Sequence, residues 1–156
     1  HRMARIEVED AFAATIAFRN GAIGTLEASA LCPGRTVSMT FEINGSKGSV
    51  VFDLERLNEL KVCLTDDRPK EIVGFHKSIM TKETDPFFDR WSASLGPHVL
   101  GYEGAFVNEI YWFINCIVNR KEISPDGATF EDGYKCAVIC DAILESSKKK
   151  RMIEVD

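Results

Sequence analysis

The chain has 156 residues, 45% of them hydrophobic and 28% charged, a balance that is typical of a folded globular protein. Its formal charge of −5 argues against a surface for nucleic acid or an anionic membrane, and no apolar run reaches the roughly 20 residues of a membrane span. This length suits one domain, so we expect residues 1–156 to form a single domain.

The first half of the chain, from Val8 to Phe75, alternates apolar and polar residues with the period of two that predicts β-strands. Six strands are expected: from Val8 to Phe18, from Ile23 to Leu31, from Val37 to Ile43, from Val50, from Leu60 to Leu64, and around Glu71 to Phe75. Tight turns join them, which predicts an open, mostly antiparallel sheet of about six strands.

Two glycines in "FRNGAIGTLEAS" (Phe18–Ser29) raise the alternative of a phosphate cradle. A dinucleotide fingerprint needs a third glycine and a strand that leads directly into a helix, whereas these glycines lead from strand to strand. Asn20-Gly21 instead predicts a hairpin with a type I′ turn, and Gly24 a bulge or a close backbone approach. "NGSKGS" (Asn44–Ser49) predicts a second hairpin.

The second half of the chain changes to helical spacing. Apolar residues recur every three to four positions in "GAFVNEIYWFINCIVN", which predicts a helix over residues 104–119. A second helix is expected from a capping-box-like start at Thr129 to about Lys149, followed by a short strand-like tail, "RMIEVD". Strands followed by helices indicate an α+β fold, with helices packed on one face of the sheet.

The other face of the predicted sheet carries small or mildly polar side chains. These are Ala11, Ala13, Thr15, Ala17, Ser38 and Thr40. A solvated face would carry more lysine and glutamate, so we expect this face to meet another sheet or domain in a homo-oligomer. A merely hydrated face remains the alternative, because apolar atoms are common on protein surfaces.

The connection from Gly74 to Gly104 is far longer than an ordinary loop, which favours a functional role. Its composition suits a sugar-like ligand or a protein contact. The candidate substrate-binding residues are His98, Tyr102, Arg90 and Trp91, with His98 ranked first. Alternatively, Phe87, Phe88 and Trp91 serve only to dock the loop on the core.

Few other motifs carry chemistry. The three histidines, His1, His76 and His98, lack metal-ligand spacing, and there is no nucleophile or EF-hand motif. The five cysteines form no C-x-x-C pair, so we expect buried, reduced thiols in a cytoplasmic protein. They are Cys32, Cys63, Cys116, Cys136 and Cys140.

Four segments in this order resemble the C-terminal domain of the glucose-fructose oxidoreductase/inositol dehydrogenase/rhizopine catabolism (Gfo/Idh/MocA) family. They are "VEDAFAATIAFRNGAIGTLEAS", "INGSKGSVVFD", "FVNEIYWFINCI" and "TFEDGYKCAVICDAILESSKKKRMIEV", with a Gly/His loop before the third. The resemblance runs from about Val8 to Val155. It implies an NAD(P)-dependent oxidoreductase acting on a sugar, polyol or related compound. The C-terminal domain in that family contributes to the substrate pocket and, through its open sheet, to the oligomer interface.

The family's glycine-rich nucleotide motif, its Glu-Lys-Pro segment with the catalytic lysine and its Asp-x-x-x-His motif have no match here, and would lie upstream of Val8. We therefore expect a C-terminal domain without its Rossmann domain and without catalytic residues of its own. By itself it would bind neither NAD nor NADP and would be inactive. A non-enzymatic α+β module for oligomerisation or small-ligand binding remains the alternative.

Overall fold

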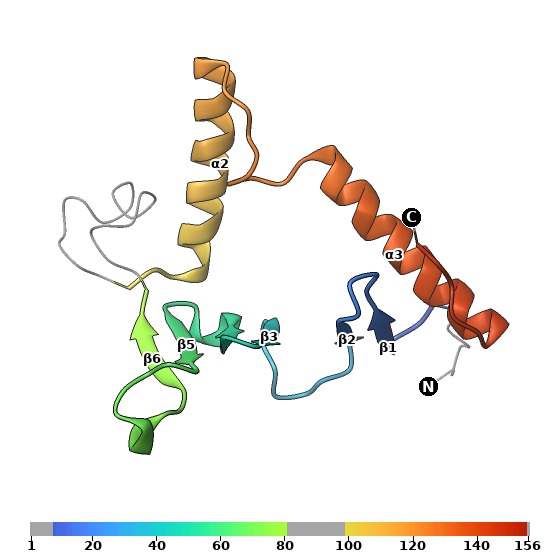
Figure 1. Cartoon of the computed structure of the whole chain (residues 1–156). Helices are drawn as coiled ribbons and strands as arrows, with labels where there is room; N and C mark the ends of the chain where they lie inside the picture. The colour runs from blue at the N-terminus through green and yellow to red at the C-terminus, as the bar shows by residue number, and fades with distance from the viewer. Residues whose placement is uncertain (1–7, 81–98, 156) are drawn as a thin grey trace. The chain divides into compact units, whose positions relative to one another are not determined.

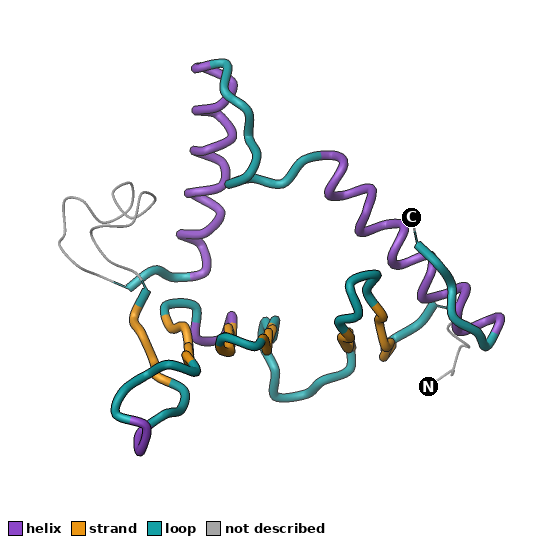
Figure 2. Tube along the Cα trace, viewed as in Figure 1, coloured by secondary structure: helices purple, strands orange, loops and turns teal. Residues whose placement is uncertain are grey.

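A computed structural model describes residues 8–80 and 99–155 of the chain. Two long helices and two open antiparallel sheets confirm the predicted α+β class (Figures 1 and 2). The described residues divide into two compact units. One comprises the chain up to Arg35 together with the part from Phe130 onward, and the other comprises Thr36–Thr129. None of the described helices is long and apolar enough to cross a membrane.

The first unit contains a two-stranded antiparallel sheet, β1 (Ala11–Ala17) and β2 (Ile23–Ser29), together with helix α3 (Phe130–Lys149). The pairing runs without a bulge from Ala11 opposite Ser29 to Ala17 opposite Ile23. Gly24 therefore lies in a regular strand, and the predicted bulge there is absent. Side chains alternate along β1 as the sequence predicts, so that one face is half-buried and the small-residue face is exposed.

The β1–β2 turn forms at the predicted place but is not a type I′ turn. Gly21 takes a φ of +88°, whereas Asn20 stays outside the left-handed region. The Gly21 N–H donates to the Phe18 carbonyl at 2.9 Å, and the Asn20 Oδ1 accepts from the Ala22 N–H at 3.1 Å. Because the Asn20 side chain caps the turn from a negative φ, only the glycine needs the left-handed conformation.

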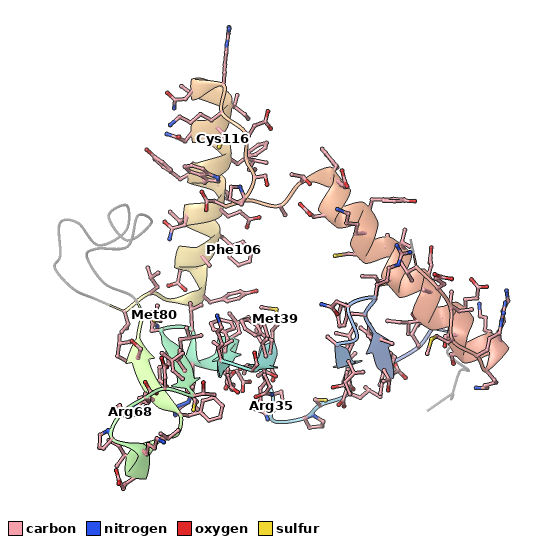
Figure 3. The ribbon with its side chains drawn as sticks, viewed as in Figure 1. Arg35, Met39, Arg68, Met80, Phe106 and Cys116 are labelled. Atoms are coloured by element: carbon pink, nitrogen blue, oxygen red, sulfur yellow. The ribbon has the colours of Figure 1, made fainter. Side chains whose placement is uncertain are left out.

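The second unit contains a four-stranded antiparallel sheet in the order β3-β4-β5-β6. The elements are β3 (Thr40–Gly45), β4 (Gly48–Asp53), the 3-10 turn η1 (Leu54–Arg56), β5 (Glu59–Leu64), the 3-10 turn η2 (Lys70–Ile72) and β6 (His76–Ile79). All six predicted strands are thus present, two in the first unit and four in the second. The connection between β2 and β3 contains Arg35, which is labelled in Figure 3.

The hairpin between β3 and β4 is confirmed, with Gly45 opposite Gly48. A Cβ added to Gly48 would lie 2.3 Å from the carbonyl oxygen of Cys63 on the neighbouring strand β5. That is closer than two such atoms can approach, so the chain requires glycine here for the close approach of β4 and β5.

The last strand, β6, lies later in the chain than predicted. Residues 70–72 form η2, and the strand begins at His76, which pairs with Val62 of β5. Two contacts of the β6 side chains accompany this register: the Lys77 Nζ lies 3.2 Å from the Glu59 Oε1, and the His76 Nε2 lies 3.5 Å from the Asp67 Oδ2. These partners lie 9 or more residues away in the chain, so local alternation could not find them.

The two predicted helices are confirmed. Helix α2 (Tyr102–Asn119) begins two residues earlier than expected, and α3 ends at Lys149 as expected. The segment after α2 is held to it by two contacts: the Trp112 Nε1 donates to the Ile123 carbonyl at 3.2 Å, and the Cys116 Sγ lies 3.5 Å from the Glu122 carbonyl.

Two smaller predictions are wrong. Residues 151–155 form no strand; instead the Arg151 carbonyl accepts a hydrogen bond from the Ser146 Oγ at 2.8 Å. The cysteines carry free thiols, but burial holds only for Cys116, which is 4% exposed. Cys63 is half-buried, and the exposed thiols are those of Cys32, Cys136 and Cys140.

Candidate functional site

Tyr102 is the one predicted substrate-binding residue within the described part of the chain. His98, Arg90 and Trp91 lie outside the described residues. Tyr102 is the first residue of α2, and it lines an open hollow of about 460 Å³ within the second unit. The other walls of this hollow come from η1, from the start of β5, from the end of β6 and from the two residues before Gly101.

The Tyr102 side chain is half-exposed and is oriented by its neighbour on the helix. Its ring meets that of Phe106 edge-on, with the centroids 5.1 Å apart and the planes at 79°. Tyr102 is 48% exposed. The edge-to-face contact favours one orientation of the ring. A half-exposed phenol can donate and accept hydrogen bonds and can stack against an apolar sugar face.

Asn58 joins three segments around the hollow. Its Nδ2 donates to the Leu100 carbonyl at 2.9 Å, and its Oδ1 accepts from the Leu100 N–H at 2.8 Å. Its own carbonyl accepts from the Met80 N–H at 2.9 Å. The residue before β5 thereby holds the chain just after β6 and just before α2. Figure 3 labels Met80 and Phe106, which mark those two elements.

The polar side of the hollow is an ion-pair group centred on Glu59. The Glu59 Oε1 lies 3.2 Å from the Lys77 Nζ, and its Oε2 lies 3.6 Å from the Arg56 Nη1. The Glu59 side chain is 21% exposed, and its buried Oε2 has no hydrogen-bond partner among the described residues. Arg56 and Glu59 line the hollow together with apolar side chains such as Ile79. Apolar walls with a few polar groups are typical of sites for small molecules.

Asn58 and the Glu59 group were not identified from the sequence. Asn58 lies in "RLNEL", between a 3-10 turn and a strand, and its hydrogen-bond partner Leu100 is 42 residues away. No local sequence pattern predicts a contact between residues so far apart in the chain. The local sequence shows only two adjacent polar residues, Asn58 and Glu59, between two leucines, and this pattern is common.

The described residues do not fit a dinucleotide or a metal. The glycine pairs of the hairpins join antiparallel strands, so neither leads into a helix N-terminus. The first turn of α2 carries Glu103, whose carboxylate lies against Gly101, and that of α3 carries Glu131 and Asp132. These negative charges oppose a pyrophosphate at either position. The described residues also contain no group of three or more potential metal ligands.

The chain matches a known protein family over residues 1–155, described as "Oxidoreductase family, C-terminal alpha/beta domain" (GFO_IDH_MocA). Levoglucosan dehydrogenase from Pseudarthrobacter phenanthrenivorans is 36% identical over 152 residues, which are 96% of this chain and 37% of that protein. Inositol 2-dehydrogenase from Rhizobium meliloti is 27% identical over 114 residues, 73% of this chain and 27% of that protein.

A solved structure of levoglucosan dehydrogenase in complex with NADH and levoglucosan has the same fold. Its TM-score is 0.82 at 35% identity, and the match covers 96% of this chain and 39% of that one. The chain therefore spans a little over a third of the length of levoglucosan dehydrogenase.

Proposed function

The chain belongs to the Gfo/Idh/MocA oxidoreductase family as its C-terminal alpha/beta domain, and from this premise we propose that it is the substrate-binding and oligomerisation domain of an NAD(P)-dependent oxidoreductase acting on a sugar, polyol or related compound. The observation that carries the proposal is the match of nearly the whole chain both to the family's C-terminal domain and to a part of levoglucosan dehydrogenase. The half-exposed Tyr102, beside a hollow with polar and apolar walls, supports it.

The proposed division of labour follows from what the described residues can hold. NAD or NADP belongs to a nucleotide-binding domain upstream, since the helix N-termini described here are acidic. That domain also supplies the groups that move the proton of the reacting carbinol. This chain orients the substrate by hydrogen bonds and stacking from Tyr102, together with His98, Arg90 and Trp91.

The role of His98 has its own test in the proposed longer protein, which consists of this chain and the upstream nucleotide-binding domain. His98→Ala is expected to raise KM for the sugar while leaving KM for the nicotinamide cofactor unchanged. Unchanged sugar kinetics in this variant would remove His98 from the proposal and leave the remaining candidates standing.

Oligomerisation is assigned to the exposed small-residue face of the β1–β2 sheet. Along β1 this face carries Ala11, Ala13, Thr15 and Ala17, all exposed. Short side chains allow a second sheet to approach closely, and a copy of the same face is the partner of matching shape. Light scattering is expected to show a dimer or larger assembly that Ala13→Glu disrupts. A monomer at high concentration would contradict this assignment.

The free thiols support a cytoplasmic location, because a reducing compartment keeps cysteines in the thiol form. Fractionation of cells that express the longer protein tests it: recovery with the cytoplasmic fraction is expected, and recovery outside the cytoplasm would contradict it.

The test of the proposal compares NADH binding by two proteins in calorimetry: this chain alone, and the longer protein that the gene encodes. Binding by the longer protein only is expected. Micromolar affinity of this chain for NADH would contradict the division of labour. A gene without an upstream nucleotide-binding domain would favour a non-enzymatic binding module instead.

A further inference from the structure

We propose that Asn58 is a positioning residue for the substrate: its side-chain amide fixes the backbone at Leu100 and thereby holds Tyr102 at the hollow. The inference rests on the proposed function of Tyr102 and adds a residue that does not itself need to touch the sugar. Asn58 lies immediately before β5, and Leu100 lies two residues before Tyr102.

The geometry requires an amide at position 58. The Nδ2 donates to the Leu100 carbonyl and the Oδ1 accepts from the Leu100 N–H, so one side chain pairs with both backbone groups of one residue, as a neighbouring strand would. The two hydrogen bonds are part-buried, which makes their loss costly because the Leu100 backbone would keep unpaired groups. The Asn58 carbonyl also accepts a hydrogen bond from the Met80 N–H, so the backbone of Asn58 is held in place beside the end of β6.

The start of α2 has no side-chain cap to fix it. Gly101 precedes the helix in an extended conformation and makes no side-chain capping bond. Its carbonyl accepts from the Gly104 N–H at 3.0 Å, and the Leu100 side chain lies over Gly104, 3.3 Å from where a Cβ there would be. The position of Leu100 therefore sets the first turn of α2. Because Tyr102 is the first residue of that turn, a shift at Leu100 displaces the Tyr102 ring.

Two substitutions at Asn58 separate its hydrogen bonds. Asn58→Ala removes both. Asn58→Asp keeps an acceptor for the Leu100 N–H but loses the donor to the Leu100 carbonyl, and it turns a carboxylate oxygen toward that carbonyl. A matched control is Asn44→Ala in β3: the Asn44 amide also makes two hydrogen bonds, to Glu42 and Ser49, but none to α2.

The experiment uses the longer protein with levoglucosan and inositol as test substrates and NAD⁺ or NADP⁺ as the acceptor. We expect Asn58→Ala and Asn58→Asp to raise KM for the better of the two substrates about tenfold, without changing KM for the nicotinamide cofactor. Asn44→Ala is expected to leave both constants unchanged. Combining Asn58→Ala with Tyr102→Phe is expected to raise the substrate KM by less than the product of the two single effects, since both act through one side chain.

Hydrogen exchange at the Leu100 amide supplies a readout that does not depend on activity. Protection is expected in the parent protein and in Asn58→Asp, and its loss in Asn58→Ala. An unchanged substrate KM in Asn58→Ala, independent effects in the double variant, or retained protection in Asn58→Ala would each overturn the role of Asn58 while leaving the proposed function intact. Turnover of neither substrate, nor of any compound in a wider panel of sugars and polyols, would instead overturn the proposed function and the role of Asn58 with it.

Discussion

Replacing Tyr102 by phenylalanine and by alanine separates what its hydroxyl does from what its ring does. Phenylalanine keeps the edge-to-face contact with Phe106, so the free energy of unfolding is expected to change by less than about 0.5 kcal/mol. Alanine loses that contact, which contributes about 0.5–1.5 kcal/mol, together with part of the burial of a ring that is already 48% exposed. We therefore expect Tyr102→Ala to cost about 1–2 kcal/mol in all.

In the substrate assay, unlike in the stability measurement, the two variants are expected to have the same effect. Both variants lack the hydroxyl and are expected to raise KM for the sugar in the longer protein about tenfold, the effect of losing a well-placed hydrogen bond. Urea denaturation and steady-state kinetics measure the two quantities. Tyr134→Phe, at an exposed position of α3, is the control and should change neither. A normal sugar KM for Tyr102→Phe would refute the hydroxyl contact, and unchanged stability of Tyr102→Ala would refute the role of the ring.

The remaining predictions concern the scaffold. Gly48→Ala is expected to destabilise the chain by about 1–3 kcal/mol in urea denaturation, because its Cβ would meet the Cys63 carbonyl; an unchanged midpoint would contradict that close approach. Gly133→Ala, inside α3 with open space at its Cβ, should stabilise by about 0.5–1 kcal/mol through helix propensity, and a loss of stability would mean that this space is filled. The hydrogen bond and the charge of Lys149 hold the pKa of Glu145 below its ordinary value of 4.5. The pair therefore stabilises α3 fully above pH 4.5, and this contribution is lost as the pH falls through the lowered pKa. The helical circular dichroism of Glu145→Gln should accordingly depend less on pH in that range, and an identical profile would exclude the pair as the cause.

Local sequence patterns predicted most elements of the fold. The prediction differs from the structure where contacts that these patterns do not contain set the position or the type of an element. Alternation in β1, helical spacing in α2 and the capping-box-like start before α3 involve only neighbouring residues, and those elements are confirmed. The position of β6 depends on pairing with β5, which no local window contains. The turn at Asn20-Gly21 was located correctly but its type was not, because the Asn20 side chain offers the backbone a second way to close the hairpin.

The candidate site was predictable to a similar extent. Tyr102 was selected as a candidate because it lies in a long connection rich in recognition side chains, and the structure places it beside the hollow. The hollow beside it could not be foreseen, because Glu59 obtains its partner Lys77 and Asn58 obtains Leu100 only through folding. Residue type therefore indicated Tyr102, whereas the pairing of residues distant in the chain could not be predicted from the sequence.

Cofactor reduction by the longer protein tests the central claim most directly. With levoglucosan or inositol and NAD⁺ or NADP⁺, the longer protein is expected to form NADH or NADPH, and this chain alone is expected to form none. Reduction of the cofactor by this chain alone would contradict its assignment as the substrate-binding domain of a sugar or polyol oxidoreductase. So would failure of the longer protein to reduce NAD⁺ or NADP⁺ with any member of a panel of sugars and polyols that includes levoglucosan and inositol.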